Sequence, residues 1–359
     1  MHRDLDGILW ALRALGAPKD FMWLVVLVWF TEGLYDLQKE FQFLEFYAGR
    51  ANLTKAMRKA GNRSARFDIL YGKTSKNKNL GSTSSDWMDL LQPSGFLLAT
   101  LFILKGGPGF VAWFGIKCSS LVAVNKGTSG RSPCFAVGHV QYPSVSTTNA
   151  LIERTLCLMM LVQACCGTWV VEQPGTSVLQ FYPLWVRMMT YFLNLFGTPV
   201  HRVTWWMSRY GAASAKRQVA YSNASGIRKL DIGWKRLNRP KIKTTVAYVN
   251  REGKKCWKGS KFLKQTEIYP EPFGEAVARI NDDLKRTRAC FLNLLPVGYP
   301  TGPQTMQTTP DTSDFSQARL AECFKYIRGA KTLNLPPAWK EIIPSFLPER
   351  QNSWEESTN

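Results

Sequence analysis

From residue 43 onwards, hydrophobic positions alternate between short β-forming runs and longer stretches with the spacing of an amphipathic helix. The clearest unit covers residues 43–61, where a run of aromatic and apolar residues is followed by the turn Ala48-Gly49. After the turn, apolar residues repeat at helical spacing up to Gly61, at Leu53, Ala56, Met57 and Ala60. We expect a buried strand, a tight turn and a helix whose first backbone amides face a ligand.

The same alternation predicts an α/β fold with a Rossmann-like, doubly wound sheet. Strands are predicted at 43–47, 64–69, 110–116, 168–172, 201–206 and 217–222. Helices are predicted at 52–60, 94–104, 148–164 and 180–195. Because ligands of such folds bind at the carboxyl ends of the strands, the residues that follow each strand are the candidates for function.

Two apolar runs raise the question of a membrane segment. Residues 21–30 are too few to span a bilayer as a helix, which needs about 20 residues. Residues 155–171 are interrupted by Gln163 and Gly167, and they divide into a buried helix and a buried strand. Core elements are therefore favoured over membrane spans. The first 20 residues mix charged and apolar positions, unlike a signal peptide, so an intracellular protein, located in the nucleus, is expected.

The chain carries a formal net charge of +20, which favours a polyanionic partner such as nucleic acid or an anionic membrane surface. A basic protein without such a partner is the alternative. Between residues 209 and 264 there are 16 Lys and Arg residues against two acids, with aromatic residues among them. This mixture favours nucleic acid, because cations neutralise phosphates and aromatic rings stack on bases. Within this segment, residues 246–257 predict a β-hairpin.

The candidates for nucleic-acid contact combine this segment with two cations from a glycine-rich stretch. They are Lys126, Arg131, Lys235, Arg236, Lys254, Lys255, Trp257 and Lys258.

The eight cysteines include no C-x-x-C pair, and there are only three histidines. Neither structural zinc nor a disulfide framework is expected, and no metal is predicted.

Chemically capable residues stand at three predicted strand ends: Asp68, Cys118 and Glu172. An acidic residue after the second strand is typical of binding to the ribose of a cofactor. The G-x-G-x-x-G spacing is absent after Gly49, so a pyrophosphate cofactor is less favoured than a smaller one.

Together these residues resemble the DNA (cytosine-5) methyltransferases, which use S-adenosylmethionine on a Rossmann-like sheet. The first motif of that family is similar to residues 43–61, with Glu45 in place of Asp and with Ala51 and Asn52 in place of later glycines. The other matching segments are Gly115–Ser120, with Lys117 instead of Pro before Cys118; Glu172–Pro174; Ser208–Asn223; and Tyr269–Ala278. The whole layout also resembles a set of predicted dinoflagellate proteins of unassigned function.

The resemblance implies that Cys118 adds to cytosine C6, that Glu172 hydrogen-bonds the base, and that Lys216 assists. It implies cofactor contacts from Glu45, Tyr47, Gly49, Asn52, Asp68 and Asp89. Cysteine suits this role because its thiolate is a strong nucleophile near neutral pH, and the target base must leave the stack of the duplex. The expected activity is methyl transfer to cytosine C5, in DNA rather than RNA.

Two alternatives stay open. Cys134 follows a proline in Pro133-Cys134 and is a second candidate nucleophile. The protein is alternatively an inactive nucleic-acid-binding protein with the same fold. The Asp/Asn-Pro-Pro-aromatic motif of amino-methyltransferases does not occur.

The expected organisation is an apolar N-terminal extension (1–40), an α/β core (41–224), a basic segment (225–266) and a helix that closes the core (267–285). The remaining residues, 286–359, predict a linker, a short helix at 314–326 and a polar tail.

Overall fold

A computed structural model of the chain describes residues 5–31, 40–71, 87–233, 242, 244–260 and 262–289. The basic residues Lys235 and Arg236 lie outside the described residues, as do the predicted linker from residue 290 onwards and the helix at 314–326.

The centre of the fold is a six-stranded sheet with the order β2-β1-β3-β4-β6-β5. Its strands are β1 (Phe41–Phe46), β2 (Ser64–Phe67), β3 (Gly106–Phe114), β4 (Thr168–Pro174), β5 (His201–Trp206) and β6 (Arg217–Ser222). The strands from β2 to β4 are parallel, whereas β6 runs antiparallel to both of its neighbours. The predicted α/β class is confirmed, and the sheet is mixed. Only residues 207–216 join β5 to β6, too few for the crossover that a parallel pair requires.

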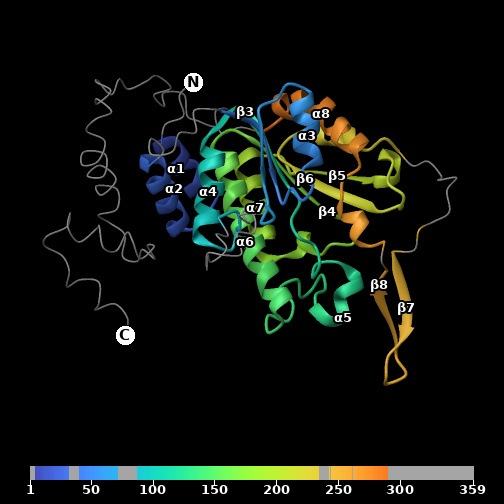
Figure 1. Ribbon diagram of the computed structural model, residues 1–359. Helices are drawn as coiled ribbons and strands as arrows, with labels where there is room; N and C mark the ends of the chain where they lie inside the picture. Colours follow the sequence, from blue (N-terminus) through green and yellow to red (C-terminus); the bar gives the residue numbers. More distant parts are fainter. Residues whose placement is uncertain are drawn as a thin grey trace, which may run out of the picture.

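Helices cover both faces of the sheet (Figure 1). One face carries α3 (Asn52–Lys59) and α8 (Glu271–Arg286), and Phe273 of α8 stacks on Trp205 of β5 with a ring-centroid distance of 5.5 Å. The opposite face carries α1 (Leu5–Ala14), α2 (Lys19–Thr31), α4 (Pro93–Leu104), α6 (Pro143–Ala164) and α7 (Pro183–Phe196). Short helical segments lie at Ala123–Asn125, Lys126–Ser129 (α5), Leu179–Phe181, Met207–Tyr210, Ser225–Leu230 and Lys264–Glu267.

Both apolar runs of the sequence form elements of this core. The first lies in α2, where Phe21, Val25 and Val28 are buried against the rest of the fold. The second divides into α6 and β4, as the sequence predicts. By length and composition α6 could cross a membrane, but 67% of its most apolar window is buried inside the protein. It is a core helix of the fold.

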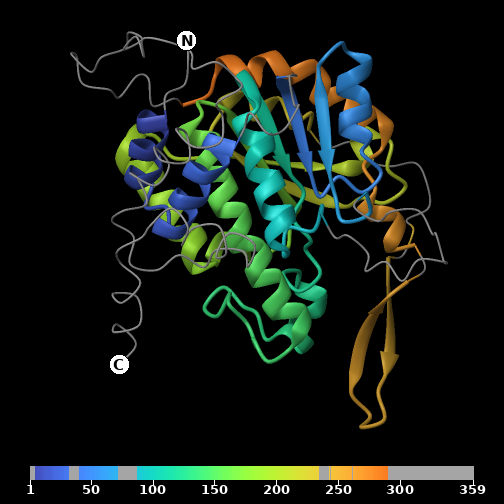
Figure 2. The same cartoon turned by 60° about the vertical axis from the view of Figure 1, so that its left-hand side comes forward.

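A two-stranded ribbon stands apart from the body of the protein, formed by β7 (Thr245–Val249) and β8 (Lys255–Gly259). Figures 1 and 2 show this hairpin projecting beyond the sheet and its helices. Asn250 shapes the turn, because its side-chain oxygen accepts the backbone N–H groups of Glu252 and Lys254. The hairpin predicted at 246–257 is therefore present.

The chain reverses its winding direction at β1, which pairs with β2 on one side and with β3 on the other. A ligand crevice in an open α/β sheet lies at such a reversal, beyond the carboxyl ends of the two strands. The turn after β1, the loop after β3 and the end of β4 meet at this edge.

Gly95 in α4 packs directly against the backbone of Asp89, in the segment that precedes the helix. A Cβ atom on Gly95 would lie 1.9 Å from the backbone oxygen of Asp89. No L-amino acid with a side chain fits there unless the backbone around Asp89 moves.

We therefore expect Gly95→Ala to destabilise the protein by roughly 1–3 kcal/mol, as overpacking commonly does, despite the better helix propensity of alanine. Urea unfolding measures the change. Gly127→Ala is the matched control, because a Cβ there meets no atom within 4 Å. Equal stability of the two variants would contradict the close packing of α4 on Asp89.

Candidate active site at the carboxyl edge of the sheet

The turn between β1 and α3 has an unusual backbone in which every second residue is left-handed. Tyr47, Gly49 and Ala51 have φ values of 59°, 51° and 54°. Two of these residues carry side chains that disfavour this region, so the surrounding contacts hold the turn in place. One such contact is made by Asp68, whose Oδ2 atom accepts the backbone N–H of Gly49 at 2.9 Å.

Glu45 is buried at the end of β1 and caps helix α3. Its Oε2 atom accepts the backbone N–H of Thr54 at 2.7 Å and the Thr54 hydroxyl at 2.5 Å. The helix has no cap from its own N-cap residue, Ala51, so the strand supplies the missing acceptor. Burial raises the pKa of Glu45 to about 7. Its second oxygen, Oε1, has no hydrogen-bond partner among the described residues.

Two of the three predicted cofactor carboxylates, Asp68 and Asp89, act on Tyr47. Burial raises the pKa of the Tyr47 phenol, and the carboxylates of Asp89 and Asp68 raise it further. Asp68 also raises the pKa of Glu45. The Arg154 guanidinium opposes the effect of these carboxylates on Tyr47. The carboxylates themselves are acceptors for a ligand with hydroxyl or amino groups.

Side chains from other elements fix these residues. The Tyr47 hydroxyl lies 2.8 Å from the Thr155 hydroxyl on α6. The Asn52 amide donates to the backbone oxygen of Tyr269 at 2.7 Å and so ties α3 to the start of α8. Asp89 accepts the backbone N–H of Leu91 at 2.9 Å, which shapes its own loop. The structure thus brings all six predicted cofactor residues to the β1 and β2 ends or the loop beside them.

Cys118, Glu172 and Lys216 form a second group at the ends of β3, β4 and β6. Burial raises the pKa of the Cys118 thiol; the Lys216 ammonium lowers it, and the Glu172 carboxylate raises it. Burial likewise raises the pKa of Glu172, against the opposing effect of Lys216. The Lys216 ammonium donates to the backbone oxygen of Thr266 at 3.1 Å, and from there its charge acts on both Cys118 and Glu172.

Tyr269 is a site residue that was not among the predicted ones, although it lies in Tyr269–Ala278, one of the segments that carry the resemblance. Its hydroxyl donates to Glu172 Oε2 at 2.7 Å and accepts from Trp113 Nε1 at 3.2 Å. Because the indole N–H of Trp113 can only donate, the Tyr269 hydroxyl accepts from Trp113 and donates its own proton to Glu172. The Glu172 atom Oε1 has no hydrogen-bond partner within the described part of the chain. In the sequence, only the position of Tyr269 as an aromatic residue directly before Pro270 and the following helix could have indicated this role.

Gln173 holds the Cys118 loop against the sheet. Its amide donates to the backbone oxygen of Ile116 at 2.8 Å, and it accepts from the Ser177 hydroxyl at 3.0 Å. Cys134 lies further along the same loop and is exposed.

The predicted nucleic-acid residues fall into different environments. Lys126, Lys254, Lys255 and Trp257 are exposed, and the last three belong to the hairpin or its turn. Lys258 lies on β8. Arg131 is buried instead, and its guanidinium donates to Asn149 at 2.7 Å and to Ser120 at 3.2 Å. It joins the loop after Cys118 to α6.

In the described parts of the chain, no three His, Cys, Asp or Glu side chains come together as a metal site. In comparisons with known proteins, no family model matches the chain and no curated protein matches it significantly.

The buried Glu45 carboxyl predicts a specific pH dependence of stability. Its pKa is higher in the folded state than in the unfolded state, so its contribution is most favourable below about pH 4.5 and is lost as pH rises through about 7. Glu45→Gln should remove this loss, because an amide oxygen can still accept from Thr54. Relative to Glu45→Gln, the wild type should lose about 3 kcal/mol over this interval.

Urea unfolding at several pH values measures this difference. Glu275→Gln, an exposed change on α8, is the control and should follow the wild type. Parallel pH profiles of wild type and Glu45→Gln would show that Glu45 does not titrate as described.

The charge of Lys216 predicts the reactivity of Cys118. Since the ammonium lowers the pKa of the thiol, Lys216→Met should raise it and leave less thiolate near neutral pH. Alkylation of Cys118 by iodoacetamide should therefore be measurably slower than in the wild type. Mass spectrometry measures the rate, with Cys134 as internal reference and Lys229→Met as control. An unchanged rate would place Lys216 too far from the thiol.

Proposed function

We propose that the protein is an S-adenosylmethionine-dependent methyltransferase that acts on cytosine C5 in nucleic acid, with DNA as the favoured substrate. The observation that carries the proposal is the group formed by Cys118 after β3, Glu172 near the end of β4 and Lys216 just before the antiparallel β6. A nucleophile, a carboxyl group that binds the base and a cation are the parts that the reaction needs.

The turn after β1 suits the proposed cofactor better than it suits a dinucleotide. Glu45 keeps a buried carboxyl oxygen without a partner in the described residues, an acceptor fit for a cationic amino group. Asp68 and Asp89 would accept hydrogen bonds from the ribose hydroxyls and the adenine amino group. When bound, this cofactor supplies an electrophilic methyl group, and its positive charge agrees with the carboxylates around Tyr47.

The chain's own residues provide the remaining chemistry. The Cys118 thiolate adds to C6 of the ring and makes C5 nucleophilic. Glu172, with its raised pKa, presents Oε1 to the ring nitrogen and exocyclic amino group, while Tyr269 holds Oε2. Lys216 favours the thiolate. After C5 has accepted the methyl group, loss of the C5 proton and release of the thiolate restore the aromatic ring.

The hairpin supports a nucleic-acid partner. Trp257 is 56% exposed at the projecting ribbon, and the Lys255 ammonium lies 5.6 Å from the centre of its ring. Trp257 pairs with Ala247, and Lys255 pairs with Val249. Because Lys255 and Trp257 are two residues apart on β8, their side chains lie on the same face of the ribbon. That face combines a phosphate contact with a stacking surface.

One observation favours the second candidate, an inactive nucleic-acid-binding protein. The Tyr269 hydroxyl already occupies one oxygen of Glu172, and burial keeps the pKa of the Cys118 thiol raised. Both features lower the readiness of the group for catalysis until a ligand changes its surroundings.

The test is incorporation of a labelled methyl group from S-adenosylmethionine into DNA. We expect incorporation by the wild type, background incorporation by Cys118→Ala, and wild-type levels with Cys134→Ala. The opposite pattern would assign the nucleophile to Cys134, and equal incorporation by all three proteins would remove both cysteines from the mechanism. An inactive wild type that still binds DNA in a salt-dependent manner would favour the second candidate.

A further inference from the structure

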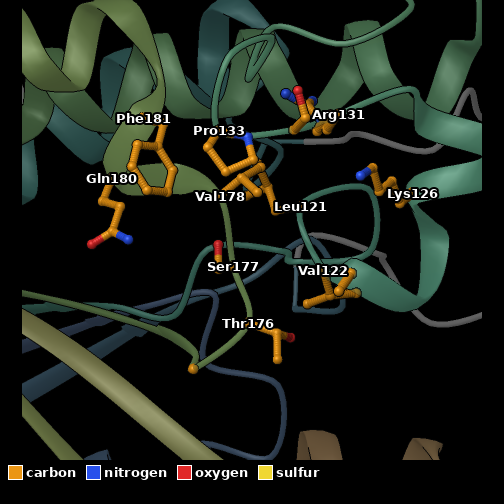
Figure 3. A pocket seen from close by; sticks show the side chains of 13 residues that line it. Leu121, Val122, Lys126, Arg131, Pro133, Thr176, Ser177, Val178, Gln180 and Phe181 are labelled. Atoms are coloured by element: carbon orange, nitrogen blue, oxygen red, sulfur yellow. The ribbon is translucent and has the colours of Figure 1, made fainter.

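A pocket of about 320 Å³ opens beside the candidate active site but does not include its reactive residues. Two segments line it: residues 121–133, which follow Cys118, and residues 175–181, which follow β4. Figure 3 shows their side chains around the opening. The volume lies in the range of small-ligand sites.

Backbone hydrogen bonds join the two segments that line the pocket to each other and to the loop that carries Cys118. The N–H of Val178 donates to the oxygen of Leu121 at 3.0 Å, and the N–H of Leu121 donates to the oxygen of Cys118 at 2.9 Å. Ser177 donates to Gln173, the neighbour of Glu172. The pocket is therefore built from the segments that continue directly from Cys118 and from the end of β4.

The walls of the pocket combine flat apolar surfaces, a polar edge and a cation. Phe181 is 40% exposed, and Figure 3 shows its ring beside the ring of Pro133. Gln180 accepts from the Tyr221 hydroxyl at 3.0 Å through Oε1, so its amide nitrogen stays available to donate. Lys126 lies at the other side of the opening (Figure 3).

We propose that this pocket receives the nucleotide next to the target base, with its base against Phe181 and its phosphate at Lys126. A nucleobase has the flat apolar faces and polar edge that the walls complement, and its phosphate needs a cation. This assignment rests on the proposed action on nucleic acid. The assignment goes beyond the proposed function, because two adjacent nucleotides would leave the base stack together. The second nucleotide would then contribute to the sequence preference of the protein.

The experiment compares binding of a short fluorescein-labelled single strand, and of its duplex, to full-length variants by fluorescence anisotropy. Phe181→Ala should weaken binding about fivefold to tenfold, the lower part of the range for loss of one base stack. Phe181→Trp should restore it. Leu193→Ala, an exposed apolar change on α7 away from the pocket, should leave binding unchanged.

Salt titrations separate the phosphate contact from the stacking contact. Lys126→Ala should reduce the slope of log K against log salt by about 0.7 for the single strand, the value for one phosphate, whereas Phe181→Ala should leave the slope unchanged. Lys59→Ala, an exposed cation on α3, is the control.

Two results would overturn the inference in different ways. Strong binding by the wild type with equal affinities for Phe181→Ala and Leu193→Ala would reject the pocket but keep the nucleic-acid partner. Absence of binding by the wild type would reject both the partner and the pocket. Loss of binding with Phe181→Ala in a protein without methyl transfer would keep a nucleotide site at the pocket but reject both the catalytic proposal and the placement of that site next to a target base.

Discussion

The hydrogen-bonded Tyr269 joins the parts of the protein that a functional site at this edge would need. Its hydroxyl links Trp113 in β3 to Glu172 in β4, and its backbone oxygen accepts from Asn52 at the start of α3. A Cβ on Gly115 would lie only 3.0 Å from the same hydroxyl, so the loop after β3 must pass close to it. Tyr269 therefore contacts two strands, one helix and the reactive loop at once.

Buried carboxyl groups give the site its electrostatic character. Glu45 and Glu172 are each held by one oxygen and keep the other without a partner in the described structure. Burial raises the pKa of both groups, which shows that the fold tolerates them at a cost in free energy. Such costs are commonly found where a ligand, rather than the fold, completes the hydrogen bonding.

Much of the fold could be predicted because each strand is an uninterrupted β-forming run between polar or glycine-containing segments. The first and last residues of the elements were less predictable. Strand β3 begins at Gly106, four residues earlier than expected, because the glycines after Lys105 allow an irregularity in its pairing with β1. Helix α6 begins at Pro143, where proline occupies the first turn, rather than at residue 148. The direction of β6 depends on a short connection, which the apolar pattern does not encode.

The candidate site was predictable in its strand-end residues but not in its supporting contacts. Asp68 and Cys118 follow strands, a position that the sequence reveals directly. Tyr269 and Arg131 act through partners more than ten residues away in the chain, and nothing local distinguishes a buried arginine from one that binds phosphate. Only the three-dimensional arrangement separates these roles.

The projecting hairpin has a thermodynamic consequence. Two strands without a third strand or a covering helix are barely stable in water, and this ribbon leaves Val249 66% exposed and Trp257 56% exposed. Within the described residues no third strand pairs with β7 or β8, so an extended chain could add to the ribbon. A partner that binds only the folded ribbon would therefore also stabilise it, because binding shifts the equilibrium between its folded and unfolded forms.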